Sequence, residues 1–376
     1  MSKNYIFYSN NQNEVNILPL KKPCINKYDN AVIVPINDSD YKYNGVFDKD
    51  GNYVHYTGKR KLGKAHNNIV PQYKKINTEY INLRVQYLGY FNFHFGHMIV
   101  DSSIRMWSIG KCQDIDKYVC IADENTLPDY YIDLLEAQGI KIENIMVLNN
   151  ATRFREVLVP DCSYVMYEYT SDYFKVPFDK LIKYQMDKFQ NSNLEYYEKI
   201  YFSRKKFVKN NKLYQYGEET IEKLFENNGF QILYPEELGI GKTIYYLQNC
   251  KVLATGVGTQ AHNIIFAHDD IEVYIINRYK TDYLTHQIPI DMSKNASITV
   301  VDACSDLSEK NCSYVYLNKY MKKFMKDRLL NYRLNIKDYF KSIIYYIMFI
   351  EHFLRVKLSI KSKVLTILKN INIINA

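Results

Sequence analysis

Short, largely apolar runs alternate with longer amphipathic stretches over the first half of the chain. Residues 118–122, 145–148 and 155–160 have the length and composition of strands. Residues 130–138 repeat their apolar positions with a helical period that ends at a glycine. Strand-length runs separated by helices are typical of βα units with a parallel sheet.

A second series of the same kind follows after residue 198. Its strand-like runs are again short and apolar, and its helical stretches separate them. The expected strands are 199–203, 230–234, 251–254 and 271–276, and the expected helices are 218–228 and 242–249.

Two successive series predict an α/β fold with two Rossmann-like domains and a cleft between them. The first 60 residues are polar and irregular, apart from short apolar runs such as 31–35. The predicted boundaries are 1–170 for the first domain, 171–198 for a helical connection, 199–313 for the second domain and 314–376 for a helical tail. Ligands of such sheets bind beyond the carboxyl ends of the strands, so candidate site residues are expected there.

The amino-acid composition is typical of a folded protein of about two domains. The chain has 376 residues, of which 47% are hydrophobic and 24% charged, as in folded proteins of about two domains. Its seven cysteines are scattered without metal-ligand or disulfide spacing, which favours reduced thiols in the cytoplasm over a zinc site. The first residues lack a basic region followed by an apolar run, so no secretory signal is expected.

The positive charge is concentrated in the tail. The formal net charge is +8, but residues 314–376 contain 13 Lys and Arg against 3 Asp and Glu. The preceding residues are therefore close to neutral. Nucleic-acid binders usually carry their basic surface on the main folded domain, so a nucleic-acid partner is not expected.

The tail is also amphipathic. Residues 319–375 have a helical pattern in which basic and apolar side chains alternate, with an apolar run at 343–350. A run of this length is too short to cross a bilayer, which requires about 20 residues. The pattern predicts a helix at an anionic membrane surface, and the alternative is a helix packed on the fold with solvated lysines.

One short segment concentrates candidate chemistry. It contains His94, His97, Asp101 and Arg105. If the chain is helical from Met98, then His97, Asp101 and Arg105 recur every four residues and share one face. This face would hold a base, its orienting partner and a cation; the alternative is a structural Asp101–Arg105 pair beside a core histidine.

A second candidate lies between the strand 251–254 and the turn 263–266. Residues 255–263 contain Gly256, Gly258 and Asn263. Glycines let a ligand approach the backbone closely, and amide groups exposed at such a turn can bind a diphosphate. Arg204, which follows the strand 199–203, is expected at the same edge; the alternative is an ordinary surface arginine.

Taken together, these motifs resemble glycosyltransferase family 61, which includes bacterial capsular polysaccharide transferases. The first shared signature is a histidine, a carboxylate and an arginine at intervals of four. The second is a strand ending in Ser-Arg, followed by a helix that opens with a glutamate and by Gly-Phe and Pro-Glu pairs. The third is a glycine-rich turn ending in Asn-x-x-Phe. The matching residues are His97, Asp101 and Arg105, then Ser203, Arg204, Glu218, Gly229, Phe230, Pro235 and Glu236, then Gly258, Thr259, Asn263 and Phe266.

The chain departs from the family pattern at a few positions. Val257 replaces a histidine of the third signature, with His262 five residues further on, and Gly217 replaces the asparagine that precedes Glu218. A glutamine in the preceding helix is Thr243 here.

The resemblance implies a GT-B architecture and an inverting transfer of a sugar from a nucleotide-sugar donor. The acceptor would be a capsular or cell-surface polysaccharide or a lipid-linked saccharide, at the cytoplasmic face of a bacterial plasma membrane. Asp101 and His97 are the expected catalytic pair, with the identity of the base left open, and His94 and Arg105 are expected on the acceptor side. The donor-binding residues would be Arg204, Glu218, Gly256, Gly258, Thr259, His262 and Asn263.

No metal or other cofactor is expected, because the arginine and the backbone amides can neutralise the leaving diphosphate. Two alternatives remain. One is a family-like protein without turnover that acts as an assembly partner, and the other is a different α/β enzyme, such as a phosphotransferase or hydrolase, that uses His97.

Overall fold

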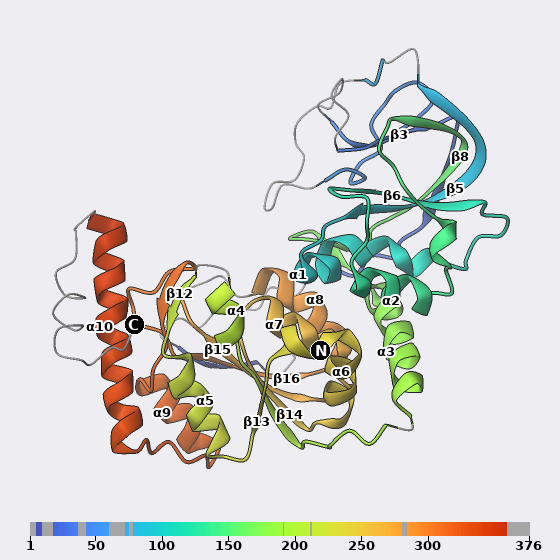
Figure 1. Ribbon diagram of the computed structural model, residues 1–376. Helices are drawn as coiled ribbons and strands as arrows, with labels where there is room; N and C mark the ends of the chain where they lie inside the picture. The colour runs from blue at the N-terminus through green and yellow to red at the C-terminus, as the bar shows by residue number, and fades with distance from the viewer. Residues whose placement is uncertain are drawn as a thin grey trace. The chain divides into compact units, whose positions relative to one another are not determined.

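The computed structural model describes residues 5–9, 18–36, 43–59, 72–74, 78–190, 192–210, 213–279 and 284–358 (Figure 1). Contacts divide the chain into two compact units. The N-terminal unit consists of Asn16–Asn191 and Thr285–Ser293. The C-terminal unit consists of Met1–Val15, Ser192–Leu284 and Lys294–Ala376.

The C-terminal unit is built on a six-stranded sheet whose strands are all parallel (Figure 1). Parallel sheets are normally covered on both faces, and the central strands here are accordingly almost wholly apolar and buried. The strand order is β1 (Tyr5–Tyr8), β16 (Ser297–Asp302), β15 (Glu272–Asn277), β14 (Val252–Gly256), β11 (Lys199–Phe202) and β13 (Gln231–Leu233).

Helices and a small parallel strand pair complete this unit. The amphipathic helix α5 (Glu218–Glu226) packs its buried side chains Ile221, Leu224 and Phe225 against the sheet. The remaining elements are α4 (Lys205–Asn210), α6 (Pro235–Asn249), α7 (Thr259–His262), η5 (Asn263–Phe266), α9 (Lys319–Asp327) and α10 (Ile336–Leu358), and the strands β12 (Tyr214–Tyr216) and β17 (Cys312–Tyr314).

The N-terminal unit contains a mixed sheet of seven strands. The long strand β5 (Glu79–Phe91) lies between β8 (Thr152–Pro160) and β6 (Lys117–Ala122) and is parallel to both. β7 (Ile145–Val147) is parallel to β6, whereas β2 (Ile25–Asp29) and β3 (Val32–Val34) pair antiparallel with β8. β4 (Gly45–Phe47) pairs with β3, and β9 (Tyr164–Val165) and β10 (Tyr169–Thr170) form a separate pair.

The helices of the N-terminal unit are mostly short. The two longest are α3 (Val176–Phe189) and α8 (Leu284–Lys294), and residues 285–293 of α8 belong to this unit although they are distant in sequence. The others are α1 (Phe95–His97), η1 (Met98–Ser102), η2 (Ser103–Ser108), α2 (Asp129–Ala137), η3 (Ile142–Asn144) and η4 (Asp172–Lys175).

The α/β fold predicted from the sequence is confirmed, and every strand expected after residue 117 is present. Two expectations are wrong. The N-terminal sheet is mixed rather than parallel, since β2 and β3 pair antiparallel with the distant strand β8. Part of the irregular start, Tyr5–Tyr8, is a strand of the C-terminal sheet. Within the segment expected to be a helical connection, η4 and α3 are helical as far as Phe189. Residues 359–375 of the predicted tail helix lie outside the described residues.

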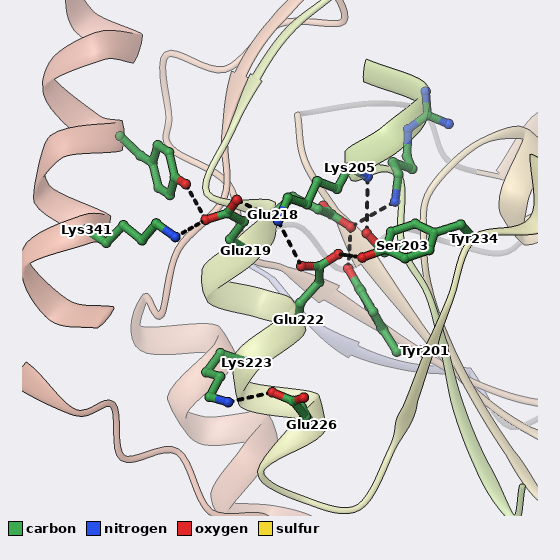
Figure 2. A network of polar contacts seen from close by, with 12 residues as sticks. Tyr201, Ser203, Lys205, Glu218, Glu219, Glu222, Lys223, Glu226, Tyr234 and Lys341 are labelled. Atoms are coloured by element: carbon green, nitrogen blue, oxygen red, sulfur yellow. Dashed lines mark hydrogen bonds and ion pairs between the residues drawn. The ribbon is translucent and has the colours of Figure 1, made fainter. Parts of the chain in front are cut away.

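The C-terminal helix α10 is tied to α5 by a charged network (Figure 2). Glu219, in the first turn of α5, accepts hydrogen bonds from Lys205 at 2.6 Å, from Tyr345 at 2.5 Å and from Lys341. Behind this network, Phe349 of α10 packs on Tyr314 of β17. The tail helix is therefore docked on the C-terminal unit by apolar and ionic contacts.

We expect Gly217→Ala to lower the free energy of unfolding by more than the strain of its positive φ would do alone. Gly217 precedes α5 with φ +88°, and a Cβ there would overlap the carbonyl oxygen of Val315. Gly139→Ala is the matched control, because it has φ +82° and open space around its Cβ position. Urea unfolding should show a loss of about 1 kcal/mol for Gly139→Ala and a clearly larger loss for Gly217→Ala. Equal losses would contradict this reading of the Val315 contact.

The Glu219 network should also make stability depend on acidity. Burial would raise the pKa of Glu219, but hydrogen bonds from Lys205, Lys341 and Tyr345 lower it to about 2, below the ordinary value of 4.5. Because the unfolded chain binds the proton first, the stabilisation is present above pH 4.5 and is lost as the pH falls towards 2. Chemical denaturation across this window should show a weaker pH dependence for Glu219→Gln than for Glu226→Gln, which removes an exposed carboxylate from the same helix. Identical slopes would refute the prediction.

Candidate active site

The carboxyl edge of the C-terminal sheet gathers residues from three neighbouring strands. β11 ends at Phe202, and Arg204 follows two residues later. The next strand, β14, ends at Gly256, and Arg278 directly follows β15. Because these strands are parallel and in register, their ends meet at one edge, so the two arginines flank the glycine turn.

Two glycines of the turn after β14 are closely approached by arginine side chains. A Cβ on Gly256 would lie 3.3 Å from the Cδ of Arg204, and a Cβ on Gly258 would lie 3.2 Å from an Nη atom of Arg278. Gly258 also has φ +106° and ψ −149°, a conformation that side chains rarely adopt. Gly258 therefore lets the guanidinium group of Arg278 lie against the backbone, and Gly256 lets the aliphatic part of the Arg204 side chain do so.

Buried amides fix this turn to its neighbours. Gln260 donates from Nε2 to the carbonyl of Ser203 at 2.7 Å, which joins α7 to the end of β11. Asn263 is buried and donates to the carbonyl of Gln260 at 3.1 Å. Asn263 thus holds the turn from within, whereas Thr259 and His262 are half-buried on α7.

The two arginines are buried cations. Arg204 is 6% exposed and Arg278 8% exposed. Arg278 donates from Nη2 to the carbonyl of Val257 at 2.9 Å, but the Nε of each arginine has no acceptor among the described residues. Burial lowers the pKa of both, and burial together with the charge of Arg204 brings that of Arg278 to about 9.

Glu218 is the acid whose charge acts on both arginines, yet its hydrogen bonds go elsewhere. Its Oε1 accepts from the hydroxyl of Tyr201 at 2.7 Å and from the backbone N–H of Arg204 at 3.2 Å (Figure 2). Glu218 therefore fixes the chain where β11 ends, and it leaves the guanidinium groups available to an anion. Two buried guanidinium groups beside a glycine turn are suited to bind phosphate groups.

In the N-terminal unit, His97 and Asp101 are in direct contact. Nδ1 of His97 lies 2.5 Å from Oδ2 of Asp101, and both side chains are partly accessible. The exposed His94 packs edge-on against His97 with ring centroids 5.2 Å apart. A carboxylate in contact with Nδ1 can orient an imidazole so that its Nε2 atom serves as a proton acceptor.

The predicted common face stops at Asp101. The chain forms a π-helical turn at Met98–Ser102 and then a 3₁₀ helix at Ser103–Ser108, so the four-residue period is lost. Arg105 is buried and donates to the carbonyls of Tyr56, at 2.6 Å, and Pro160. It does not pair with Asp101, so the structural ion pair considered as an alternative is also wrong.

Arg105 instead lines a cavity of about 370 Å³ within the N-terminal unit. Its guanidinium holds the carbonyl of Tyr56, a residue in the left-handed region with φ +62°. The tyrosines Tyr28, Tyr53, Tyr56 and Tyr169 share the lining with hydrogen-bonding groups that include Asp48, Asn52 and Asp161.

Further ionisable groups surround His97 and Asp101. The charge of Asp101 acts on Tyr90, whose hydroxyl donates to Asp123 at 2.5 Å, and Lys59 pairs with Asp123 at 2.8 Å. His286 of α8 is largely buried, and this burial lowers its pKa. The charge of Asp101 raises the pKa of His286, whereas the charge of His97 lowers it further. Among the described ranges, no group of three or more His, Cys, Asp or Glu side chains is arranged to hold a metal ion.

Sequence reasoning missed Arg278, His286 and the Tyr90–Asp123 pair. Arg278 and Asp123 directly follow strands, so position at a carboxyl edge was an available signal for both. His286 lies far from His97 in sequence and comes near it because residues 285–293 of α8 belong to the N-terminal unit. No local sequence pattern predicts this placement of α8.

A comparison with curated proteins found no match. The model of the family described as Glycosyltransferase 61 matches residues 95–274. This segment contains the His97–Asp101 pair, Arg105, Arg204, Glu218 and the glycine turn, whereas His94 and Arg278 lie outside it. The match supports a glycosyltransferase of family 61 as the identity of the segment that carries both groups of residues.

Proposed function

We propose that the protein is an inverting glycosyltransferase of GT-B architecture that takes its sugar from a nucleotide-sugar donor. The acceptor is a capsular or other cell-surface polysaccharide of a bacterium, or its lipid-linked precursor. The observation that carries this proposal is the pair of buried arginines at the glycine turn, because Arg204 and the turn lie within the segment that matches the family.

The donor diphosphate is bound at the carboxyl edge of the C-terminal sheet. Arg204 and Arg278 supply charge-assisted hydrogen bonds, and residues 256–259 supply a close backbone surface. These groups stabilise the negative charge that develops as the bond between the anomeric carbon and the diphosphate breaks. The proposal therefore contains no metal ion. Glu218 and Asn263 position this edge from beneath, through the contacts of their side chains.

His97 is the base in this proposal, and Asp101 orients it. An Nδ1–H donated to Asp101 leaves Nε2 as the acceptor of a proton. The acceptor hydroxyl oxygen attacks the anomeric carbon while its proton moves to Nε2 of His97. The nucleoside diphosphate leaves from the opposite face, so a single displacement inverts the configuration.

The cavity beside Arg105 is the part of the N-terminal unit best suited to an acceptor saccharide. Its tyrosine rings can stack on sugar faces, and its carboxylates and amides can bind hydroxyl groups. Arg105 would contribute indirectly, because its guanidinium fixes Tyr56 in the cavity wall.

We further propose that the enzyme works in the cytoplasm, at the inner face of the plasma membrane. All seven cysteines lie in the described ranges and none forms a disulfide bond; four of them are buried, which is compatible with a reducing compartment.

A thermal-shift screen followed by turnover assays tests the function as a whole. UDP-, GDP-, CMP- and dTDP-sugars are each added to the full chain, since a ligand of the folded state raises the melting temperature. We expect one donor to raise it and to be consumed when a saccharide acceptor is present. Stabilisation without transfer or hydrolysis would favour a binding partner that has lost turnover, and no response to any of them would refute the proposal.

We predict that Arg278→Gln weakens binding of the donor, or of the free nucleoside diphosphate, by about tenfold or more, as expected for charge-assisted hydrogen bonds. Arg204→Gln should have a similar effect. Lys206→Gln is the control, because Lys206 lies next to the same region but is exposed and pairs with Glu237. Calorimetric titration measures the affinities. Wild-type affinity in Arg278→Gln would remove this residue from the donor site.

We predict that His97→Ala lowers kcat by about 10²- to 10⁴-fold, while donor affinity remains unchanged, because a general base acts on the acceptor. Asp101→Asn should also lower kcat, since an amide can stabilise the wrong imidazole tautomer. Initial rates and donor titrations on the same preparations separate the two effects. Full turnover in His97→Ala would assign the base to another group, with Asp101 the first candidate.

A further inference from the structure

Exposed apolar side chains are concentrated at the C-terminal end of the described chain. Of the 17 large hydrophobic residues that are exposed among the described residues, nine lie between positions 329 and 356. Single exposed hydrophobic residues are common, but a dense group marks an interaction surface. The nine are Leu329, Tyr332, Ile336, Tyr339, Phe340, Ile343, Tyr346, Leu354 and Val356.

Helix α10 has two apolar faces, and the described residues cover only one of them. Tyr345, Phe349 and His352 face the C-terminal unit, where they contact Glu219, Tyr314 and Tyr214. The exposed stripe recurs at intervals of three and four residues from Ile336 through Ile343, on the opposite side of the helix. α10 therefore adheres to the fold by one side and presents a second apolar side to the surroundings.

The loop before α10 presents another exposed apolar side chain. Leu329 is 94% exposed and has φ +56°, a conformation that is strained for a branched residue. The loop is held on both sides of it: Arg328 bonds Glu272 and Thr299, and Asn331 exchanges hydrogen bonds with Asn228. The fold thus fixes Leu329 in a strained conformation that leaves its side chain outside.

Basic residues accompany the stripe. Residues 314–376 carry 13 Lys and Arg against 3 Asp and Glu. Arg333 and Lys337 are exposed beside Ile336, and neither forms an ion pair with a carboxylate in the part of the chain that the structure describes. None of the described helices is long and apolar enough to span a bilayer.

We propose that this surface, Leu329 to Val356, binds an anionic membrane. Leu329, Ile336, Phe340 and Ile343 enter the boundary between headgroups and acyl chains, and Arg333 and Lys337 contact the lipid phosphates. The positive charge favours an anionic bilayer over a protein partner, because Arg333 and Lys337 lie at the start of the apolar stripe and residues 314–376 carry 13 Lys and Arg against 3 Asp and Glu. This inference concerns a different part of the molecule from the donor and acceptor residues, and it does not depend on the transferase activity.

Co-sedimentation of the full chain with vesicles tests the proposal. We expect binding to vesicles of phosphatidylcholine mixed with phosphatidylglycerol, and much weaker binding to phosphatidylcholine alone. The double substitution Phe340→Asp and Ile343→Asp should lower the partition coefficient by more than about tenfold, as the loss of two buried apolar side chains predicts. Arg333→Gln with Lys337→Gln should weaken binding and reduce its dependence on salt.

Ile142→Asp is the matched control, since Ile142 is an equally exposed apolar residue of the N-terminal unit. It should bind vesicles like the wild type. Circular dichroism and melting temperature check that the substituted residues, which are exposed, leave the fold intact. No binding of the wild type to the anionic vesicles would overturn the proposal, as would wild-type binding by the Phe340→Asp and Ile343→Asp variant. A dimer in sedimentation velocity that this variant dissociates, without vesicle binding, would assign the surface to a second copy of the chain instead.

Discussion

The burial of two guanidinium groups at one edge of a parallel sheet is the constraint that explains most of the C-terminal unit. A buried cation is costly unless a partner compensates its charge, and two adjacent cations repel each other as well. The charge of Glu218 acts on both Arg204 and Arg278 and partly compensates them. The hydrogen bonds of Glu218, however, go to Tyr201 and to the backbone. Such an arrangement destabilises the free protein, and it is rational if an anionic ligand supplies the missing partner.

The glycines and the neighbouring side chains follow from the same constraint. Gly256 and Gly258 leave the space that the two arginines occupy, so their role extends beyond allowing a turn. Gln260 and Asn263 use buried amides to hold the turn, because a mobile turn would not keep both cations in place. At Val257, where the resemblance leads us to expect a histidine, the backbone carbonyl accepts a hydrogen bond from Arg278. The backbone at this position thus takes part in the site whatever its side chain is.

What the sequence could predict was local. Apolar runs located β6, β11, β14 and β15, and the spacing of four brought His97 and Asp101 into contact. Tertiary pairing decided the rest. Tyr5–Tyr8 carries no distinctive pattern and becomes a strand only because β16 offers it an edge. Arg105 leaves the expected face because the chain changes from a π turn to a 3₁₀ turn, and helical periodicity cannot foresee such a change. Arg278 could be recognised as a candidate site residue only from the strand order, which places β15 beside β14.

Helix α5 connects the candidate donor site to the tail. Its first two residues are both glutamates, and each contacts a different part of the unit (Figure 2). Glu218 accepts a hydrogen bond from the backbone N–H of Arg204. Glu219 contacts Lys205 of α4 and the α10 residues Lys341 and Tyr345. Gly217 lets the chain enter this helix where any side chain would overlap the backbone of Val315. The close contact at Gly217 thus ties the start of α5 to the segment that leads into the tail. Because α10 is clamped at the first turn of α5, a membrane that fixes α10 would also fix the end of the sheet at which Arg204 lies.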